Sequence, residues 1–456
     1  MMIFDVWRFA LLGPLLTAAL PLVAQAQLRL PGGLPQLPAV VERPLDRLQR
    51  GAEGTLGTTT GTAVETLRGA RRAAEQSLLR NWPGRVEADP NGAPVRRGEL
   101  LLVDPGEALL QAAQAQGFTL LRSTMLEGLD LRQVVLAPPN GLSLADALAR
   151  LRALDPGLEA DYHHLYRPSG AAASTARGAS EGPPNEPAGS PGAAPAAPVV
   201  ARVGLIDGGV DAQHPSLRSS VLQRWGCEGL PAAADAHGTA VASLLVGRDA
   251  DFTGALPGAT LFSADVYCGA PDGGGAEAVA QALAWMARQR VGVVNISLVG
   301  PANRLLERVV DRLAARGHLL VAAVGNDGPA APPLYPAAYA GVLAIAGVTP
   351  SRRVLPEAGQ GPHVAFAAPG ADIAAARAGS AGYRVVRGTS FAAPLVAGGL
   401  AGGLPQPDIA ARQRLLLALQ AVAHDLGARG RDPVYGHGLV AEDLRVPPQR
   451  VQAAAP

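Results

Sequence analysis

The sequence predicts an α/β protein with a parallel sheet flanked by helices, preceded by a small ferredoxin-like α+β unit. From residue 199 onward, short apolar runs such as VVARVGLID alternate with helical patterns such as AEAVAQALAWMARQ. This alternation is typical of βαβ units around a parallel sheet. Residues 99–167 instead show the order β-α-β-β-α-β, which is that of a ferredoxin-like fold.

The composition is that of a chain with a large core and little net charge. The chain has 456 residues, of which 48% are hydrophobic, and a formal net charge of +1. This length predicts two or three units, and the charge gives no reason to expect nucleic acid or an acidic membrane as partner. All basic residues are arginine, which excludes a P-loop lysine, a Schiff-base lysine and a Ser-Lys dyad.

The first 26 residues are typical of an export signal. Arg8 precedes an apolar run over residues 9–23, and Ala24 and Ala26 supply the small residues of a cleavage site. We expect residues 1–26 to be removed and the protein to be exported, to the periplasm or the cell exterior. An uncleaved anchor stays open as the alternative. No later stretch predicts a membrane span, so we expect no membrane contact after signal cleavage.

Residues 27–98 form a poorly defined N-terminal segment, interrupted by proline and glycine, with one helical pattern over residues 62–80. No chemistry can be assigned to this segment. The small unit then begins with a strand at residues 99–103. A helix follows, with Asp104 as its expected N-cap and Gly117 as its stop.

Two further strands, at residues 119–126 and 129–136, and a helix beginning at Ser143 continue the small unit. The strand LEADYHHLY closes it. We expect its histidines, His163 and His164, to lie on the surface of an edge strand. A pH-sensitive clasp or a pair of metal ligands is the alternative.

Beyond the small unit, residues 168–198 are thick with Pro, Gly, Ser and Ala and predict a disordered linker. The main α/β domain then covers residues 199–444, and residues 445–456 form a tail.

Four polar residues stand at the ends of predicted elements of the main domain: Asp207, His237, Asn326 and Ser390. Each taken singly has a structural interpretation, as a cap, a core histidine or a turn residue. In open parallel sheets, however, chemistry takes place where the strands end, so the four together predict a site.

The residue types suit acyl transfer. Ser390 is a weak nucleophile that needs a base, His237 can accept its proton, and Asp207 can hold the imidazole in the right tautomer. The oxyanion then needs donors, which the side-chain amide of Asn326 and the backbone N–H of Ser390 at a helix start can supply. A secreted esterase with the same triad predicts the pattern G-x-S-x-G, which is not found around Ser390.

The segments LIDGGVDAQHPSL, DAHGTAVASL, VNISL, AVGNDG and GTSFAAP resemble, in order and spacing, the signature segments of the subtilisin-like serine proteases. The resemblance covers residues 199–444 and implies a subtilisin-like fold, a triad of Asp207, His237 and Ser390, and Asn326 as oxyanion donor. It also implies that residues 99–167 are a propeptide that inhibits its own active site. We therefore expect a secreted endopeptidase of peptide or protein substrates, made as a zymogen that cleaves itself between about residues 168 and 199.

The same resemblance implies a substrate-binding segment and an opposite edge segment. The residues concerned are Ser297, Leu298, Val299, Gly300, Gly273 and Gly274. Val299 stands where the family commonly has glycine, so we expect a narrowed pocket and a preference for small residues just before the cleaved bond.

The two cysteines, Cys227 and Cys268, lack the spacing of a zinc site. In an exported protein we expect them to form a disulfide, and free buried thiols are the alternative. We expect no catalytic metal and no cofactor, since the histidines form no HExxH motif or comparable ligand set. The asparagine-rich calcium loop of many relatives is missing. Asp249, Asp251 and Asp272 stay open as ligands of a structural calcium ion, but no ligand run of the expected kind is visible, so the sequence does not support that site.

A catalytically silent binding module on the same fold, or a permanently inhibited protease, is the alternative to an active enzyme, because fold alone does not prove activity.

Overall fold

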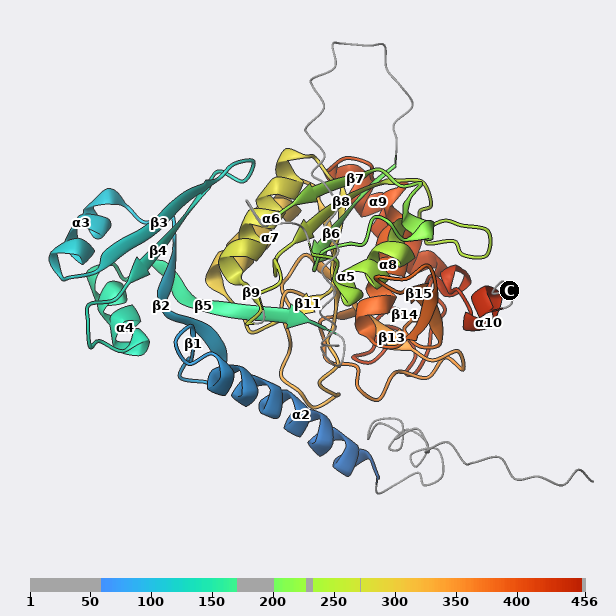
Figure 1. Cartoon of the computed structure of the whole chain (residues 1–456), viewed down its shortest axis with the longest axis horizontal. Coiled ribbons are helices and arrows are strands. Elements are labelled where there is room, and N and C mark those ends of the chain that lie inside the picture. Colours follow the sequence, from blue (N-terminus) through green and yellow to red (C-terminus); the bar gives the residue numbers. More distant parts are fainter. Residues whose placement is uncertain (1–58, 170–200, 227–232, 271, 453–456) are drawn as a thin grey trace, which may run out of the picture. The chain divides into compact units, whose positions relative to one another are not determined.

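Two sheets organise the chain in the computed structural model, which describes residues 59–169, 201–226, 233–270 and 272–452 (Figure 1). The predicted signal peptide, most of the predicted linker and Cys227 lie outside the described residues. The described residues belong to one compact unit.

The main domain is built on a seven-stranded sheet in which every neighbouring pair is parallel. Its strand order is β14-β13-β12-β10-β6-β8-β7. The strands are β6 (Arg202–Asp207), β7 (Leu222–Trp225), β8 (Thr260–Asp265), β10 (Val293–Ile296), β12 (Leu319–Ala323), β13 (Val342–Val348) and β14 (Val364–Pro369). All but β7 are largely buried runs of apolar residues, as expected for strands covered on both faces.

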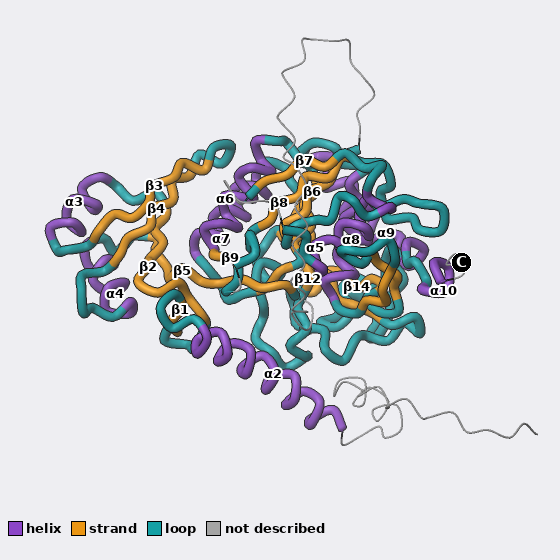
Figure 2. The backbone as a smooth tube through the Cα atoms, in the orientation of Figure 1, coloured by secondary structure: helices purple, strands orange, loops and turns teal. Residues whose placement is uncertain are grey.

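Helices cover both faces of this sheet (Figure 2). On one face lie α5 (Ala236–Val246) and α8 (Thr389–Ala401), and on the other lie α6 (Ala276–Arg288) and α7 (Arg304–Ala315). Successive residues of a strand point to opposite faces. The parallel sheet flanked by helices is therefore confirmed.

The remaining elements of the main domain lie around this core. They are the hairpin β15 (Ile373–Ala376) and β16 (Tyr383–Val386), helices α9 (Ile409–Val422) and α10 (Pro448–Gln452), and two 3-10 turns, Pro215–Leu217 and Glu442–Leu444. Val446 is buried against the same core, so the packed part of the chain continues into the predicted tail.

The small unit contains the six elements in the predicted order. They are β2 (Pro94–Val103), α3 (Glu107–Ala115), β3 (Thr119–Leu126), β4 (Leu131–Ala137), α4 (Leu144–Leu154) and β5 (Glu159–Pro168). The strands form an antiparallel sheet in the order β5-β2-β4-β3. β2 begins at Pro94, before the predicted start at residue 99.

In this unit the predicted helix start at Ser143 is confirmed, and the predicted N-cap Asp104 is wrong. The Ser143 hydroxyl accepts the N–H of Asp146 at 3.1 Å and caps α4. Helix α3 instead has Gly106 at its N-cap, without a side-chain cap. Asp104 lies in the left-handed region, with φ of 46°, and its carboxylate accepts the N–H of Arg132 at 2.6 Å. Asp104 therefore binds the backbone of β4 and does not cap α3.

Before the small unit lie helix α2 (Thr59–Asn81) and the short strand β1 (Val86–Ala88), which pairs with β2. The helical pattern at residues 62–80 is thus confirmed. Leu78 of α2 packs with Val86 and with Leu165 of β5. Among the described residues, no helix has both the length and the apolar character that a membrane span requires.

Strand β5 of the small unit also pairs with two short strands that belong to the main domain in sequence. Beyond its pairing with β2, its end pairs antiparallel with β9 (Gly274–Gly275) on one side and with β11 (Leu298–Val299) on the other. The expectation of surface histidines on an edge strand is wrong, because His163 and His164 are both buried. His163 contacts Glu99 at 2.7 Å.

Candidate active site

Asp207 and His237 form a buried pair at the carboxyl end of strand β6. Asp207 is the last residue of β6 and is fully buried, and His237 lies in the first turn of α5. Both carboxylate oxygens lie 2.9 Å from Nδ1 of the imidazole. Burial lowers the pKa of His237, but the neighbouring carboxylate outweighs this and raises the pKa above its ordinary value.

Asp235 holds the start of α5 in place. Its side chain caps the helix by accepting the N–H groups of His237 and Gly238, both at 2.8 Å. His237 is therefore held by its backbone as well as by its ring. Within the described ranges of the chain, its Nε2 is buried and has no hydrogen-bond partner.

Ser390 stands in the first turn of α8 and does not cap it. The N-cap is Gly388, and no side chain caps this helix. The Ser390 hydroxyl is buried and has no hydrogen-bond partner among the described residues. The next residue, Phe391, packs against His237, and the centroids of the two rings are 5.3 Å apart. The cap interpretation of Ser390 is therefore wrong.

Asn326 follows strand β12 and reaches the start of α8. Its Oδ1 accepts the N–H of Thr389 at 3.0 Å, while its Nδ2 is buried without a partner. Thr389 also accepts the N–H of Gly325 through its hydroxyl, at 3.2 Å. These two bonds tie the turn after β12 to the helix that carries Ser390, and they leave the Asn326 amide free to donate.

Gly388 brings the serine and the asparagine together. Its φ is 137°, a conformation that favours glycine. A Cβ added there would lie 3.2 Å from Nδ2 of Asn326 and 3.6 Å from Oγ of Ser390. A donor amide and a serine hydroxyl thus border the same small space.

A second polar network binds the backbone carbonyl of Ser390. The Asn295 amide donates to the Ser297 hydroxyl at 2.8 Å, and that hydroxyl donates to the carbonyl of Ser390 at 3.1 Å. Sequence reasoning did not assign this role to Asn295, nor the role of Thr389. Both stand inside quoted motifs, VNISL and GTSFAAP, but nothing in the spacing says which backbone groups they meet.

The end of β5 occupies the space between β9 and β11. Val299 pairs with Arg167, and Gly274 pairs with Tyr166, so residues of both predicted substrate-binding segments contact one strand. The N–H of Ser169 donates to the carbonyl of Ser297 at 3.1 Å. Since Ser297 also binds the carbonyl of Ser390, Ser169 and Ser390 are bridged by one residue.

Tyr166 fills a pocket under this strand. It is fully buried, and its hydroxyl donates to the carbonyl of Pro301 at 2.6 Å. Two ring carbons lie 2.6 Å from where a Cβ on Gly300 would stand, so any side chain at residue 300 would collide with the ring. Sequence reasoning did not single out this tyrosine.

Two clusters of described residues hold three potential metal ligands each. Asp207, Asp235 and His237 are engaged in the contacts above. In the other, Glu99, His163 and Glu277, the Arg122 guanidinium already donates to both carboxylates. The expectation of no catalytic metal stays a prediction.

The predicted disulfide also stays a prediction, because Cys227 lies outside the described residues. The strand before Cys227, β7, is the parallel neighbour of β8, which Cys268 follows.

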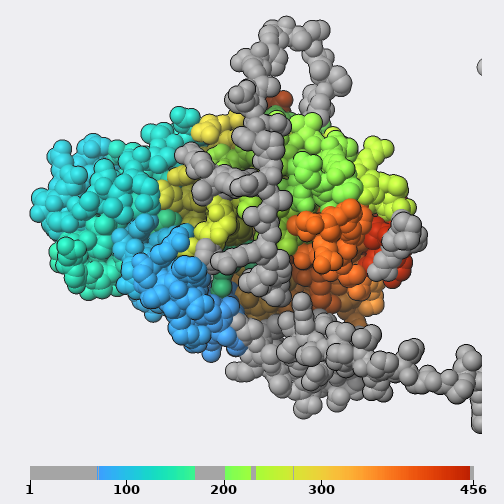
Figure 3. Space-filling view, in the orientation of Figure 1, coloured from blue at the N-terminus to red at the C-terminus, as the bar shows by residue number. Residues whose placement is uncertain are grey.

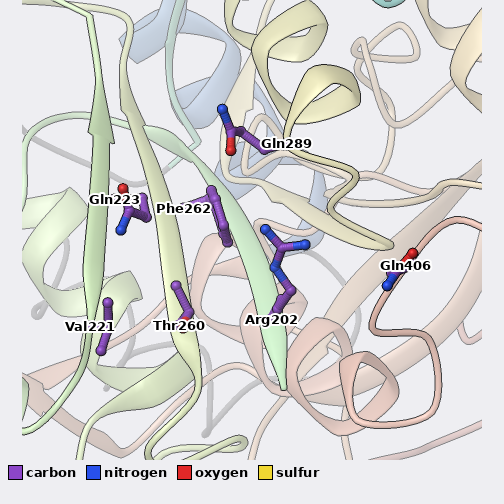
Figure 4. Close-up of a pocket in the computed structure, with 7 residues that line it drawn as sticks. All are labelled: Arg202, Val221, Gln223, Thr260, Phe262, Gln289 and Gln406. Carbon is purple, nitrogen blue, oxygen red and sulfur yellow. The ribbon is translucent and has the colours of Figure 1, made fainter. Parts of the chain in front are cut away.

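A separate hollow lies at the opposite end of the parallel sheet (Figure 4). It is lined by Arg202, Val221, Gln223, Thr260, Phe262, Gln289 and Gln406. The Arg202 guanidinium lies over the Phe262 ring, 4.6 Å from its centroid. This hollow carries none of the four predicted catalytic residues, so it is not the candidate active site.

A parallel α/β fold with a buried Asp–His pair and an unpartnered serine at a helix start defines a serine-protease type of site. The profile of the subtilase family matches residues 201–438, just over half of the chain. The chain belongs to the subtilase family.

Individual relatives agree with this assignment. The chain is 31% identical over 247 residues to subtilisin Savinase of Lederbergia lenta, a match that covers 52% of this chain and 88% of Savinase. It is 30% identical over 207 residues to the minor extracellular protease Epr of Bacillus subtilis (strain 168), covering 45% of this chain but only 32% of Epr. The crystal structure of fervidolysin from Fervidobacterium pennivorans, a keratinolytic enzyme related to subtilisin, matches with a TM-score of 0.59 at 18% identity. That match covers 81% of this chain and 63% of fervidolysin, and it supports the fold alone.

Proposed function

We propose that this protein is an exported serine endopeptidase that is made as a zymogen and cleaves itself. We call residues 59–169 the prodomain and residues 201–452 the catalytic domain. Its main support is the path of β5, which runs between β9 and β11 and is followed directly by Ser169, one bridging residue from Ser390.

In the proposed mechanism the Ser390 hydroxyl attacks the carbonyl carbon of the peptide bond, and His237 Nε2 accepts the hydroxyl proton. Asp207 stabilises the imidazolium through Nδ1. The negative charge on the tetrahedral oxygen is met by Asn326 Nδ2 and the backbone N–H of Ser390 at the helix start. The C–N bond then breaks, His237 protonates the departing amine, and water hydrolyses the acyl-enzyme.

The prodomain is proposed to be a ferredoxin-like inhibitor of its own active site. Its β-α-β-β-α-β order and the strand order β5-β2-β4-β3 support this reading. Peptides that bind by adding a strand to a sheet edge gain affinity from main-chain hydrogen bonds. Strand β5 adds such bonds on two sides, which blocks the path that a substrate would take.

The bond between Ser169 and Gly170 is the proposed cleavage site. Ser169 is the last described residue of this stretch, and its N–H is bound by Ser297 in the cleft between β9 and β11. Its small buried side chain agrees with the narrow pocket expected beside Val299. Small residues just before the cleaved bond are therefore the proposed preference. Export is supported by the signal-like residues 1–26, and a Cys227–Cys268 disulfide suits that compartment.

The catalytically silent module is the less favoured function. All four positions that the chemistry needs are filled by the required residue types, and the Ser390 hydroxyl has no structural hydrogen bond that would explain its presence.

The test is the intact mass of the secreted protein. Wild-type protein should yield a fragment that begins at Gly170, whereas Ser390→Ala should keep the bond and show no hydrolysis of casein. Equal masses for the two proteins would rule out self-processing, and casein hydrolysis by Ser390→Ala would rule out the mechanism.

A further inference from the structure

Asp272 of the catalytic domain is held by two arginines of the prodomain. It lies directly before the β9 edge and its side chain is fully buried. Its Oδ2 pairs with Arg96 and, at 3.2 Å, with Arg85. Arg96 also donates to the carbonyl of Gly273 at 3.2 Å. The other oxygen of Asp272 is buried and meets no hydrogen-bond partner in the part of the chain that the structure describes.

Two more carboxylates near the cleft are paired in the same way. Arg122 of β3 donates to Glu277 at 2.8 Å, just beyond β9. Arg71 of α2 pairs with Asp327, the residue next to the proposed oxyanion donor Asn326. The space-filling view shows the blue and cyan residues of the prodomain adjoining the yellow residues of α6, which carries Glu277 (Figure 3).

The charges are sorted by location. At the C-terminal end of α6 and at α7 the polarity is reversed, since prodomain carboxylates meet catalytic-domain arginines. The pairs there are Glu127 with Arg288, Asp130 with Arg316 and Glu159 with Arg308. Among the described residues, the catalytic domain supplies the carboxylate of an interdomain ion pair only beside the cleft.

Departure of the prodomain would leave the cleft-side carboxylates without their counter-charges. Removing the guanidinium from a partly buried ion pair leaves the carboxylate charge uncompensated, which costs free energy. Asp272 and Glu277 border β9, while Asp327 borders the turn of Asn326, so the carboxylates flank the path of β5 on both sides.

We propose that Asp272, Glu277 and Asp327 form an acidic rim that selects peptides with arginine or lysine N-terminal to the cleaved bond. This inference rests on the proposed function, because the rim becomes accessible only after self-processing.

We expect the rim to bind the side chain of the third residue on the N-terminal side of the cleaved bond. In the uncleaved chain this residue is Arg167, whose Cγ lies 3.5 Å from where a Cβ on Gly273 would stand. Burial lowers the pKa of Arg167, Glu75 and Asp327 favour its charged form, and Arg71 opposes it. Arg71 leaves with the prodomain, which frees Asp327 for a basic side chain of the substrate.

The test compares two fluorogenic peptides on the processed protein, Tyr-Arg-Pro-Ser and Tyr-Gln-Pro-Ser, each with the fluorophore after serine. We expect kcat/KM to be about fivefold higher for the arginine peptide, the size of effect that a partly exposed ion pair supports. The ratio should fall toward one in Asp327→Asn and Asp272→Asn and should stay unchanged in Glu442→Gln. Glu442 pairs with Arg352 on an exposed part of the surface.

A second measurement does not depend on folding of the variants. Raising the salt from about 0.05 M to about 0.5 M shortens the range of charge interactions, so the wild-type ratio should shrink. A ratio near one in the wild-type protein, or a ratio that neither the variants nor salt change, would overturn the acidic rim. Hydrolysis of neither peptide would instead overturn the proposed function, and the rim with it.

Discussion

The two polar atoms of the Asn326 side chain have different surroundings. Its oxygen is used by the N–H of Thr389, which fixes the amide plane, and its nitrogen is left buried and unpartnered. A buried donor without an acceptor costs free energy. The cost is explained if the acceptor is an oxyanion that exists only during the reaction.

Replacing Asn326 by alanine tests this role. We expect kcat to fall by about 10²- to 10³-fold with little change in KM, because the lost hydrogen bond forms in the transition state. Steady-state peptide hydrolysis measures both constants. An equal rise in KM with unchanged kcat would show instead that Asn326 binds the ground state.

The pH profile of activity tests the His237–Asp207 pair. His237 must be neutral to accept the Ser390 proton, so activity is lost as the pH falls through the pKa of the imidazole. Because the carboxylate raises that pKa, the acid limb of kcat/KM should have its midpoint above about 6.5, the ordinary value. A midpoint below that value would contradict the pair as described.

At the scale of elements, the pairing of strand β5 with β9 and β11 cannot be read from the sequence of β5 alone. LEADYHHLY predicts a strand, and the alternation of its side chains is visible. Which side chain enters a pocket depends on the register with β9 and β11, which lie more than a hundred residues away. The same reason explains the error over His163 and His164, since partners distant in sequence bury them.

Tyr166→Ala tests the contribution of β5 to self-processing. Loss of a fully buried aromatic ring removes a large packing term, so cleavage of the chain should slow by about tenfold or more, measured as the half-time for appearance of the Gly170 fragment. Tyr166→Phe is the matched control, because it keeps the ring and loses the hydrogen bond to Pro301, worth about 1 kcal/mol.

Unfolding of the variants must be separated from slow cleavage. The double variants with Ser390→Ala remain intact, and their melting temperatures report on stability alone. If Tyr166→Ala is processed as fast as the wild-type protein, the pocket under β5 has no part in positioning the cleaved bond.

At the scale of the whole molecule, the sequence predicts the main sheet well and points to a candidate site at its carboxyl edge, whose catalytic role stays a prediction. Apolar strands alternating with helices give the fold, and Asp207, His237, Asn326 and Ser390 follow from residue type and their places at element ends. Local signals succeed because they need no knowledge of distant partners, as the cap at Ser143 illustrates. Asp104 fails for the opposite reason, since its carboxylate binds a residue on another strand.

Contacts between the prodomain and the catalytic domain are the part that sequence reasoning could not provide. The pairs of Arg71 with Asp327 and of Arg96 with Asp272 join residues 256 and 176 positions apart. No periodicity or composition encodes such pairs. They become visible only when both sheets are folded and β5 lies between β9 and β11.

Covalent labelling of the processed protein with a fluorophosphonate tests the central claim most directly. The reagent reacts with a serine that an adjacent base activates. We predict one adduct per chain, which peptide mass mapping assigns to Ser390, and no adduct in Ser390→Ala or His237→Ala. An adduct on another residue, or an unlabelled wild-type protein after confirmed cleavage at Gly170, would contradict the assignment of Ser390 as the nucleophile.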